Sequence, residues 1–326
     1  MIDKLWIYEG QSYDPHYNLA VEEYLLESVE PGQCVLYLWQ NRHTVVIGRN
    51  QNPWKECRTT LLEQEGGHLA RRLSGGGAVF HDLGNLNFTF LVCLEDYSVP
   101  RQMEVIRSAV ASLGIPAEVS GRNDILAQGR KFSGNAFYKN GRQAYHHGTL
   151  LVDADMEKMT RYLNPSKAKL QSKGVDSVRS RVINLRELNP DISIPALKQA
   201  LAASFSQVYG LPVSPLPIGL LDTDAVDRLY ARNRSWDWNF GLKMPFSFEC
   251  EGRFPWGGIQ ICLLMESGHI QTVKVYSDAM EWELATQIET ALQGCRLVKD
   301  ELEAAVTAAV PSLAEDLCSL LEQLDL

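Results

Sequence analysis

The pattern of apolar and polar residues predicts a chain that mixes strands with helices. Val35–Trp39 and Thr44–Ile47 are short apolar runs, which is typical of buried strands. Residues 86–92 alternate with a period of two and place two phenylalanines on one face of a strand. Residues 103–113 carry apolar side chains at helical spacing, and Gly114 follows where a C-terminal cap would lie.

Capping residues indicate where two further helices begin and end. Asn18 is expected to cap a helix that runs to about Ser28, since asparagine accepts hydrogen bonds from the first N–H groups of a helix. Ser193 and Gly210 would begin and end another helix, with an apolar face between them.

A hairpin is predicted between strands at 132–139 and 142–152. Asn140-Gly141 joins them, and this dipeptide favours a type I′ turn. Because strands and helices follow one another without a regular βαβ alternation, the fold class is expected to be α+β.

The last quarter of the chain predicts a second, smaller domain. Two strand patterns at 259–264 and 270–276 precede three helical patterns, near 281–293, 300–310 and 312–324. We therefore expect a first domain at 1–241, a linker at 242–250 and a C-terminal domain at 251–326.

Composition narrows the class of protein. The chain has 326 residues and a net charge of −9, which argues against a general nucleic-acid binder. Its seven cysteines form no Cys-x-x-Cys pair and are odd in number, so reduced thiols in a cytoplasmic protein are expected. The N-terminus lacks the apolar core of a signal peptide, and no 18-residue apolar run predicts a membrane span.

Residues 71–82 are the most informative stretch. Arg71, Arg72 and Ser74 precede three consecutive glycines, which bring bare backbone N–H groups close to an anion. Arginine adds a planar fork for a carboxylate or phosphate. The stretch therefore predicts a cradle for an acidic small molecule, and the alternative is a glycine-rich hairpin with two surface arginines.

A second polar stretch lies near the predicted hairpin. Asn123 and Asp124 suit contacts to a nucleotide or to an Mg²⁺ ion held by oxygen atoms. Lys131 supplies a compact charge for a carboxylate or phosphoryl group, unless it is an ordinary surface lysine. His146 and His147 are neighbours on a strand and so point to opposite faces, which argues against a shared metal.

The segment 165–186 is locally basic, with six basic residues and one acidic residue. It predicts either a flexible lid over phosphates or a solvated basic loop. The sequence has no Gly-x-x-x-x-Gly-Lys-Ser/Thr loop, no Gly-x-Gly-x-x-Gly after a strand and no Gly-x-Ser-x-Gly elbow, which excludes the commonest nucleotide-binding and hydrolase motifs.

Taken in order, these motifs resemble the lipoate–protein ligase family, in its two-domain bacterial form. The resemblance spans the chain and rests on residues 18–23, 52–57, 71–82, 121–124, 131–134, 147–150, 177–182 and 254–258. It implies a mixed-sheet α+β catalytic domain of the lipoate/biotin ligase type and a small α+β accessory domain. It also implies ATP-dependent activation of lipoate to lipoyl-AMP, followed by transfer to a lysine of an apo lipoyl domain of a 2-oxoacid dehydrogenase E2 subunit or of the glycine-cleavage H protein.

The resemblance also implies roles for individual residues. Lys131 would be catalytic, and Asp124 would be a candidate ligand for the Mg²⁺ that accompanies ATP. The lipoyl group would be bound by Arg72, Ser74, Gly75, Gly76, Gly77, His81, Lys131 and His147. The nucleotide would be bound by Arg72, Gly77, Ala78, Val79, Phe80, Asn123, Asp124, Ser177, Val178, Ser180, Arg181 and Val182. No permanently bound cofactor is expected, and the protein is expected to be a monomer.

Three other functions stay open to different degrees. An acyl-ACP-dependent octanoyltransferase would need a nucleophilic cysteine after an Asn-Pro, but Asn164-Pro165 is followed by Ser166 and no cysteine lies between Cys93 and Cys250. A lipoyltransferase that uses preformed lipoyl-AMP or an acyl donor, without efficient adenylation, would share the same motifs. The intact Lys131 and Arg72 argue against a non-catalytic lipoate or nucleotide sensor.

Overall fold

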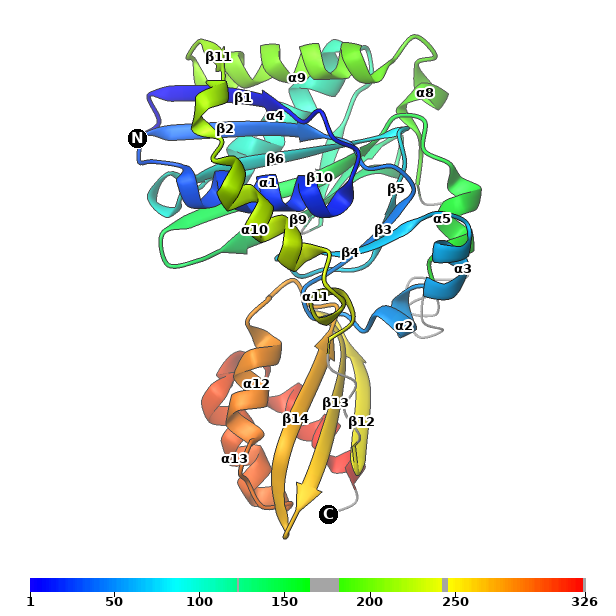
Figure 1. Ribbon diagram of the computed structural model, residues 1–326, viewed down its shortest axis with the longest axis vertical. Helices are drawn as coiled ribbons and strands as arrows, with labels where there is room; N and C mark the ends of the chain where they lie inside the picture. The colour runs from blue at the N-terminus through cyan, green and yellow to red at the C-terminus, as the bar shows by residue number, and fades with distance from the viewer. Residues whose placement is uncertain (122, 165–181, 242–245, 325–326) are drawn as a thin grey trace.

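An eight-stranded mixed sheet forms the centre of the larger, N-terminal part of the molecule (Figure 1). The structure, a computed structural model, describes residues 1–121, 123–164, 182–241 and 246–324. In spatial order the strands are β11 (Val213–Pro215), β1 (Lys4–Glu9), β2 (Gln33–Trp39), β6 (Asn85–Cys93), β10 (Gln143–Leu151), β9 (Arg130–Lys139), β8 (Asp124–Ala127) and β7 (Glu118–Ser120). The strands from β2 to β7 pair antiparallel, whereas β1 pairs parallel with both neighbours.

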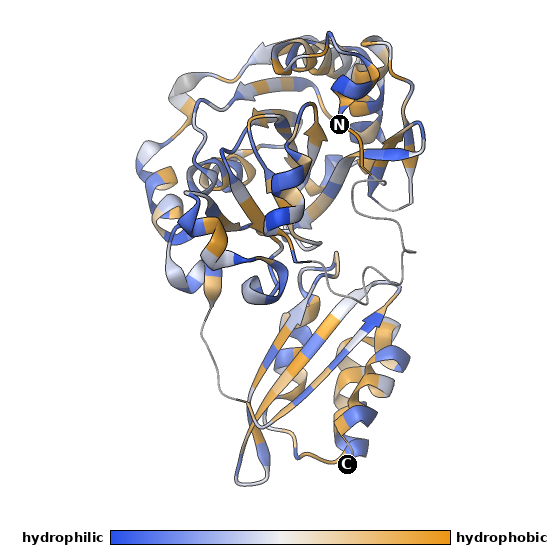
Figure 2. Cartoon of the chain, turned by 90° about the vertical axis from the view of Figure 1, so that its right-hand side faces the viewer, coloured by the Kyte–Doolittle hydropathy of each residue, from blue (hydrophilic) through white to orange (hydrophobic). Residues whose placement is uncertain are grey.

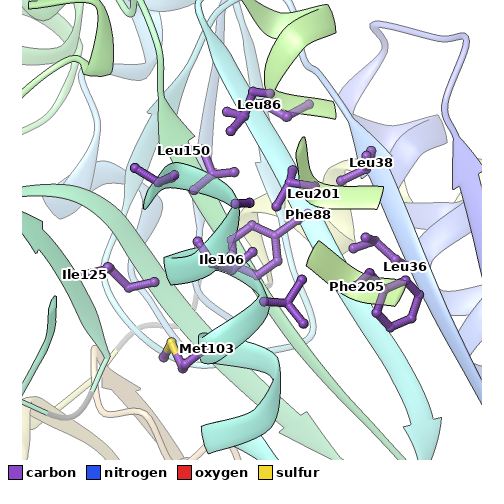
Figure 3. Packing of buried hydrophobic residues seen from close by; sticks show 14 of the residues in the cluster. Leu36, Leu38, Leu86, Phe88, Met103, Ile106, Ile125, Leu150, Leu201 and Phe205 are labelled. Carbon is purple, nitrogen blue, oxygen red and sulfur yellow. The ribbon is translucent and has the colours of Figure 1, made fainter. Parts of the chain in front are cut away.

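Helices cover both faces of this sheet because each face carries its own apolar set. On one face pack α4 (Val99–Ser112) and α9 (Ile194–Tyr209), and Figure 3 shows how their side chains interlock with those of the strands. On the other face pack α1 (Pro15–Ser28) and α10 (Thr223–Asn233). The predicted α+β class is confirmed.

A second sheet of three strands lies beside the first. Its order is β4 (His68–Arg71), β3 (Thr44–Ile47) and β5 (Val79–His81). Short helices lie around it: α2 (Pro53–Glu56), α3 (Thr59–Gln64), α5 (Met156–Tyr162) and α11 (Trp236–Phe240). Helix α8 (Leu185–Leu188) instead packs Leu185 into the core of the large sheet. The connection from β4 to β5 is the glycine-rich stretch, so this small sheet fixes both ends of that loop.

The C-terminal part has its own apolar core, formed between a three-stranded sheet and three helices. The elements are β12 (Phe248–Phe254), β13 (Gly257–Glu266), β14 (His269–Ser277), α12 (Leu284–Leu292), α13 (Lys299–Ala309) and α14 (Ala314–Leu321). Along β14 buried and exposed positions alternate, and Figure 2 shows the corresponding alternation of apolar and polar residues. The last residues of the predicted linker at 242–250 belong to β12, which begins at Phe248 and pairs with β13.

The predicted cap of helix α1 is corrected by the structure. The cap of α1 is Asp14, whose carboxylate accepts from the N–H groups of His16 and Tyr17. Asn18 lies inside the helix instead, and its buried amide donates to the carbonyl oxygens of Ser12 and Gln40.

The hairpin of β9 and β10 forms as predicted, but not with a type I′ turn. Neither Asn140 nor Gly141 has a positive φ. The side-chain oxygen of Asn140 accepts from the N–H groups of Arg142 and Gln143, so an asparagine side chain closes the turn. Among the described residues, no helix combines the length and the apolar character that crossing a membrane would require.

Candidate functional site

A cavity of about 540 Å³ lies where the small sheet, the β9–β10 hairpin and the C-terminal part meet. Apolar side chains, among them Leu19, Val46 and Leu151, form part of its wall, and polar groups form the rest. The C-terminal part also contributes to the lining, with Arg253, Pro255, Trp256, Gly257, Asp278 and Met280.

Arg72 holds the glycine-rich loop in shape. Its Nη2 donates to the carbonyl oxygens of Gly75 and Gly77, at 2.7 and 2.8 Å, and its Nε donates to Ser74 Oγ at 3.0 Å. Nη1 donates to the carbonyl of Val46. Burial lowers the pKa of the guanidinium to about 10, so Arg72 is still charged at neutral pH. The guanidinium, which was predicted to bind a ligand, thus donates its hydrogen bonds to the loop itself.

The same loop also contacts the C-terminal part. Gly76 has a φ of +88° and donates its N–H to the carbonyl of Ala279 at 3.0 Å. A Cβ at Gly75 would lie 2.4 Å from that carbonyl oxygen and 2.7 Å from the carbonyl oxygen of Met280. Bare glycine backbone is therefore needed here for contact within the protein as well as for any ligand.

A chain of buried hydrogen bonds runs behind the loop. Ser74 Oγ lies 2.8 Å from His147 Nε2, and His147 Nδ1 lies 2.9 Å from Glu22 Oε1. Thr89 donates to the same carboxylate oxygen and accepts from the indole N–H of Trp39. Because a carboxylate only accepts, His147 donates through Nδ1, and Nε2 accepts from Ser74. This chain joins a ring in the cavity wall to the start of the loop.

Lys131 and Asp124 form an ion pair at the edge of the cavity. Lys131 Nζ lies 2.6 Å from Asp124 Oδ1, and both side chains are about one-third exposed, at 35% and 33%. The lysine side chain lies over Gly134, where a Cβ would come within 2.8 Å of Cε and Nζ. Val182 forms a parallel bridge with Lys131, so the first described residue after 165–181 lies beside the lysine.

Two asparagines fix the polar end of the cavity. Asn123 and Asn135 each donate a side-chain N–H to the other's backbone carbonyl, at 2.9 and 3.0 Å. Asn135 Oδ1 lies 2.9 Å from Nε2 of His146, which is fully buried. The pair is thus held rigidly on one side by backbone and on the other by a buried ring.

His146 and His147 lie on opposite faces of β10, as their adjacency on a strand requires. His147 lines the cavity, whereas His146 packs against Phe88 and Phe137. Burial lowers the pKa of His146 to about 3, and burial likewise lowers that of His81 to about 3. Both rings are therefore neutral near pH 7.

The structure gathers most of the predicted site residues around this one cavity. The lining includes Arg72, Gly76, Gly77, Ala78, Val79, Phe80, His81, Asn123, Asp124, Lys131, His147 and Val182. Ser74 and Gly75 do not line it, because the hydroxyl of Ser74 is buried against His147 and Gly75 faces the C-terminal part. Ser177, Val178, Ser180 and Arg181 lie outside the described residues.

Sequence reasoning missed two contributors to the site. Glu22 is an ordinary helical glutamate by pattern, and its partner His147 is 125 residues away. Arg253 belongs to β12, which the pattern did not predict. Two signals for the second were available: the alternation of apolar and charged residues along 248–254, and the Phe254-x-Trp256-Gly257-Gly258 motif that follows Arg253.

A metal site built from protein side chains alone is not present in the part of the chain that the structure describes. No three histidine, cysteine or carboxylate side chains gather there in a way that could hold an ion. Asp124 offers one carboxylate at the cavity, and Glu56 and Asp278 also line it. This fits an Mg²⁺ ion that arrives with a nucleotide, because such ions take one or two carboxylates and several phosphate oxygens.

Comparison with protein families gives matches over both parts of the chain. The model of the lipoyl protein ligase A/B catalytic domain matches residues 14–206. The model of the bacterial lipoate protein ligase C-terminus matches residues 243–313.

Solved structures with the same fold cover the whole chain or its larger part. LipL1 of P. falciparum, solved in complex with lipoate, is 26% identical, with a TM-score of 0.85 over 98% of this chain and 99% of its own. A lipoate-protein ligase A bound with ATP is 25% identical, with a TM-score of 0.64 over 74% of this chain and 100% of its own. A bi-partite lipoate protein ligase of Thermoplasma acidophilum, described with its E2 lipoyl domain, is also 25% identical, with a TM-score of 0.65 over 75% of this chain and 98% of its own.

Proposed function

The chain belongs to the lipoyl protein ligase A/B catalytic-domain family, and on that basis we propose that it activates lipoate with ATP and transfers the lipoyl group to a protein lysine. The observation that carries this proposal is the placement of Lys131, Asp124 and Asn123 at one cavity that also has apolar walls. Structures of relatives with lipoate and with ATP support the two substrates.

Lipoate combines an apolar chain with a terminal carboxylate, and the cavity offers a matching pair of environments. Leu19, Val46 and Leu151 would line the path of the hydrocarbon, where each buried methylene contributes about 0.8 kcal/mol. The carboxylate would then lie toward Lys131, a partly exposed cation that lines the cavity.

In the first step a carboxylate oxygen of lipoate bonds to the α-phosphorus of ATP. The bond from that phosphorus to the bridging oxygen breaks, and pyrophosphate leaves with the electron pair. Two anions must approach each other, so a cation between them lowers the barrier. Lys131 takes this place when it moves from Asp124 to the substrate oxygens.

In the second step the acceptor lysine, as a free amine, attacks the carbonyl carbon of lipoyl-AMP. The carbon–oxygen bond to the phosphate breaks, AMP leaves with the electron pair, and the amine gives up a proton. Negative charge grows on the carbonyl oxygen and then on AMP, and Lys131 would stabilise both. Asn123, fixed by Asn135, would hold the nucleotide end of the intermediate.

The nucleotide would enter with Mg²⁺, and Asp124 is the carboxylate that would contact this ion. The neighbouring Gly77–Phe80 backbone would hold the adenosine, while the roles of Ser177, Val178, Ser180 and Arg181 stay predictions. For the acceptor we propose a lipoyl domain of a 2-oxoacid dehydrogenase E2 subunit or the glycine-cleavage H protein. The T. acidophilum ligase, described with its E2 lipoyl domain, supports the first of these.

The test measures the two half-reactions separately. Lipoate-dependent exchange of radiolabelled pyrophosphate into ATP reports adenylation, and transfer from synthetic lipoyl-AMP to an apo lipoyl domain reports the second step. We expect both activities. Transfer without exchange would instead establish a lipoyltransferase. The absence of both activities would refute the proposed function.

A further inference from the structure

Arg253 is a charged side chain at the cavity that the chemistry above does not use. It lies on β12 and lines the same cavity as Lys131, although the two residues belong to different parts of the molecule. Its side chain is 25% exposed, so the protein does not enclose it fully.

The surroundings of Arg253 are built to hold its guanidinium in one place. Nη1 donates to both carboxylate oxygens of Asp278, at 3.2 and 2.9 Å. Asp278 is itself held by the N–H of Gly258 at 2.7 Å. A Cβ at Gly258 would lie 2.9 Å from Arg253 Nη1, so the glycine leaves the space in which the guanidinium lies. The Trp256-Gly257-Gly258 motif thereby acquires a positioning role.

Arg253 is also tied to the glycine-rich loop. Ala279, the residue after Asp278, accepts the N–H of Gly76. The backbone segment that carries Asp278, the partner of Arg253, is therefore hydrogen-bonded to the loop that was predicted to cradle an anion. Within the described residues, the hydrogen bonds of Arg253 use Nη1 alone, so Nε and Nη2 remain as donors for a ligand.

The other two cations of the lining have different duties. Arg72 directs its donors to carbonyl oxygens and to Ser74. Lys131 serves the carboxylate and the α-phosphate, which are present in both half-reactions. The β- and γ-phosphates are present only in the first half-reaction, in which they form the pyrophosphate leaving group.

We infer that Arg253 binds the departing pyrophosphate during adenylation and has no part in lipoyl transfer. This inference rests on the proposed function. As the bond between the α-phosphorus and the bridging oxygen breaks, negative charge moves onto pyrophosphate, and a guanidinium stabilises it by two parallel N–H bonds. Arg253 is then a catalytic residue that the C-terminal part adds to the site.

The experiment compares Arg253→Gln with Arg296→Gln in the full chain. Arg296 is a matched control, because it also belongs to the C-terminal part but is 65% exposed and pairs with Glu301 away from the cavity. Arg253→Gln is expected to lower lipoate-dependent pyrophosphate exchange by about a hundredfold, the size seen when one charge-stabilising donor is removed. Transfer from synthetic lipoyl-AMP should stay within about twofold of the unchanged chain, since this step contains no pyrophosphate.

Exchange that stays within about twofold, or an equal fall in both half-reactions, overturns the inference. If Arg253→Gln does not fold, Arg253→Lys replaces it, since lysine keeps the charge beside Asp278 but not the fork. A loss of exchange of at least about tenfold is then expected, and unchanged exchange overturns the inference.

Binding of inorganic pyrophosphate, measured by calorimetry, separates this inference from the proposed function. If the unchanged chain lacks both half-reactions, the proposed function fails by itself. Pyrophosphate affinity that falls about tenfold in Arg253→Gln but not in Arg296→Gln still supports the site, and equal affinity in all three proteins refutes it.

Discussion

At the scale of single residues, the site separates buried groups that hold its shape from exposed groups that are free to meet a ligand. Arg72, His146 and His147 are buried and hydrogen-bonded, whereas Lys131 and Asp124 are each about one-third exposed. A buried charge without a counter-charge is costly, and Arg72 offsets that cost through its hydrogen bonds to carbonyl oxygens. We expect substitutions in the first group to alter stability and substitutions in the second to alter chemistry.

Replacing Lys131 by Met tests this separation. Both half-reactions should fall by at least about a hundredfold, because the charge is used at each transition state, while the melting temperature should change little for a side chain paired only at the surface. Exchange and transfer assays measure the first effect, and thermal unfolding measures the second. Lys4→Met, on β1 and outside the cavity lining, is the control. Near-normal transfer from synthetic lipoyl-AMP would contradict the role in the second step.

The buried ring of His146 makes stability depend on pH. Its pKa is about 3 in the folded protein and about 6.5 when unfolded, so between these values the unfolded chain binds a proton that the folded chain excludes. The free energy of unfolding therefore falls as the pH falls through this window. In His146→Gln, which keeps a donor for Asn135, the slope near pH 5 should be shallower by up to about 1.4 kcal/mol per pH unit. Urea unfolding at several values between pH 7 and pH 5 measures the slope, and an identical slope in both proteins would refute the argument.

Residue types and order, with the family resemblance that they carry, were sufficient to predict many residues that line the cavity, but not the partners of each side chain. Some residues stand out in the sequence because their types and order match the family motifs, namely the glycine-rich stretch, Asn123 and Lys131. Glu22 and Arg253 do not stand out, since their contacts depend on residues 125 and 25 positions away. Such contacts follow from the tertiary fold, which local patterns do not encode.

At the scale of elements, the loop between β4 and β5 depends on the backbone freedom of its glycines. Gly76→Val places a β-branched side chain at a φ of +88°, with its Cβ 3.1 Å from Arg72 Nη2 and 3.2 Å from Met280 Sδ. We expect binding of lipoyl-AMP to be abolished, as measured by calorimetry. Gly141→Val is the control, because a Cβ there meets nothing within 4 Å. Unchanged affinity with an unchanged melting temperature would show that the loop is an ordinary turn.

Elements with strong local signals were predicted well. Helix α9 begins after Ser193 and ends at Gly210, as the cap residues indicate. The cap of α1 was misplaced because both Asp14 and Asn18 are capping types, and only the tertiary contacts of Asn18 distinguish them. Strand β12 was missed although Phe248, Cys250 and Phe254 alternate with charged residues, because Gly252 interrupts this short period-two pattern.

At the scale of the whole molecule, hydrogen bonds join the C-terminal part to the N-terminal part, and Asn50 makes two of them. Its side-chain N–H donates to the carbonyl of Trp282 at 2.7 Å, and its own carbonyl accepts from Ser277 at 2.9 Å. Asn50→Ala removes the first bond, at a cost of about 1 kcal/mol, which corresponds to a roughly fivefold larger equilibrium constant for local opening.

Hydrogen exchange measures this opening. The amides of Gly76 and Ser277, which donate across the contact, should exchange faster in Asn50→Ala than in the unchanged chain. Asn140→Ala, in the β9–β10 turn, should leave both amides unaffected. Equal exchange in all three proteins would mean that Asn50 does not hold the two parts together.

The N–H of Gly76 is a single donor with two potential acceptors. It now bonds Ala279, so an anion that takes this donor must compete with the C-terminal part for it. Competition of this kind is reciprocal. If docking of the C-terminal part lowers the affinity for the anion by a given factor, the bound anion weakens docking by the same factor. A substitution that tightens the contact around Ala279 would therefore weaken anion binding by the loop without altering any residue of the cavity.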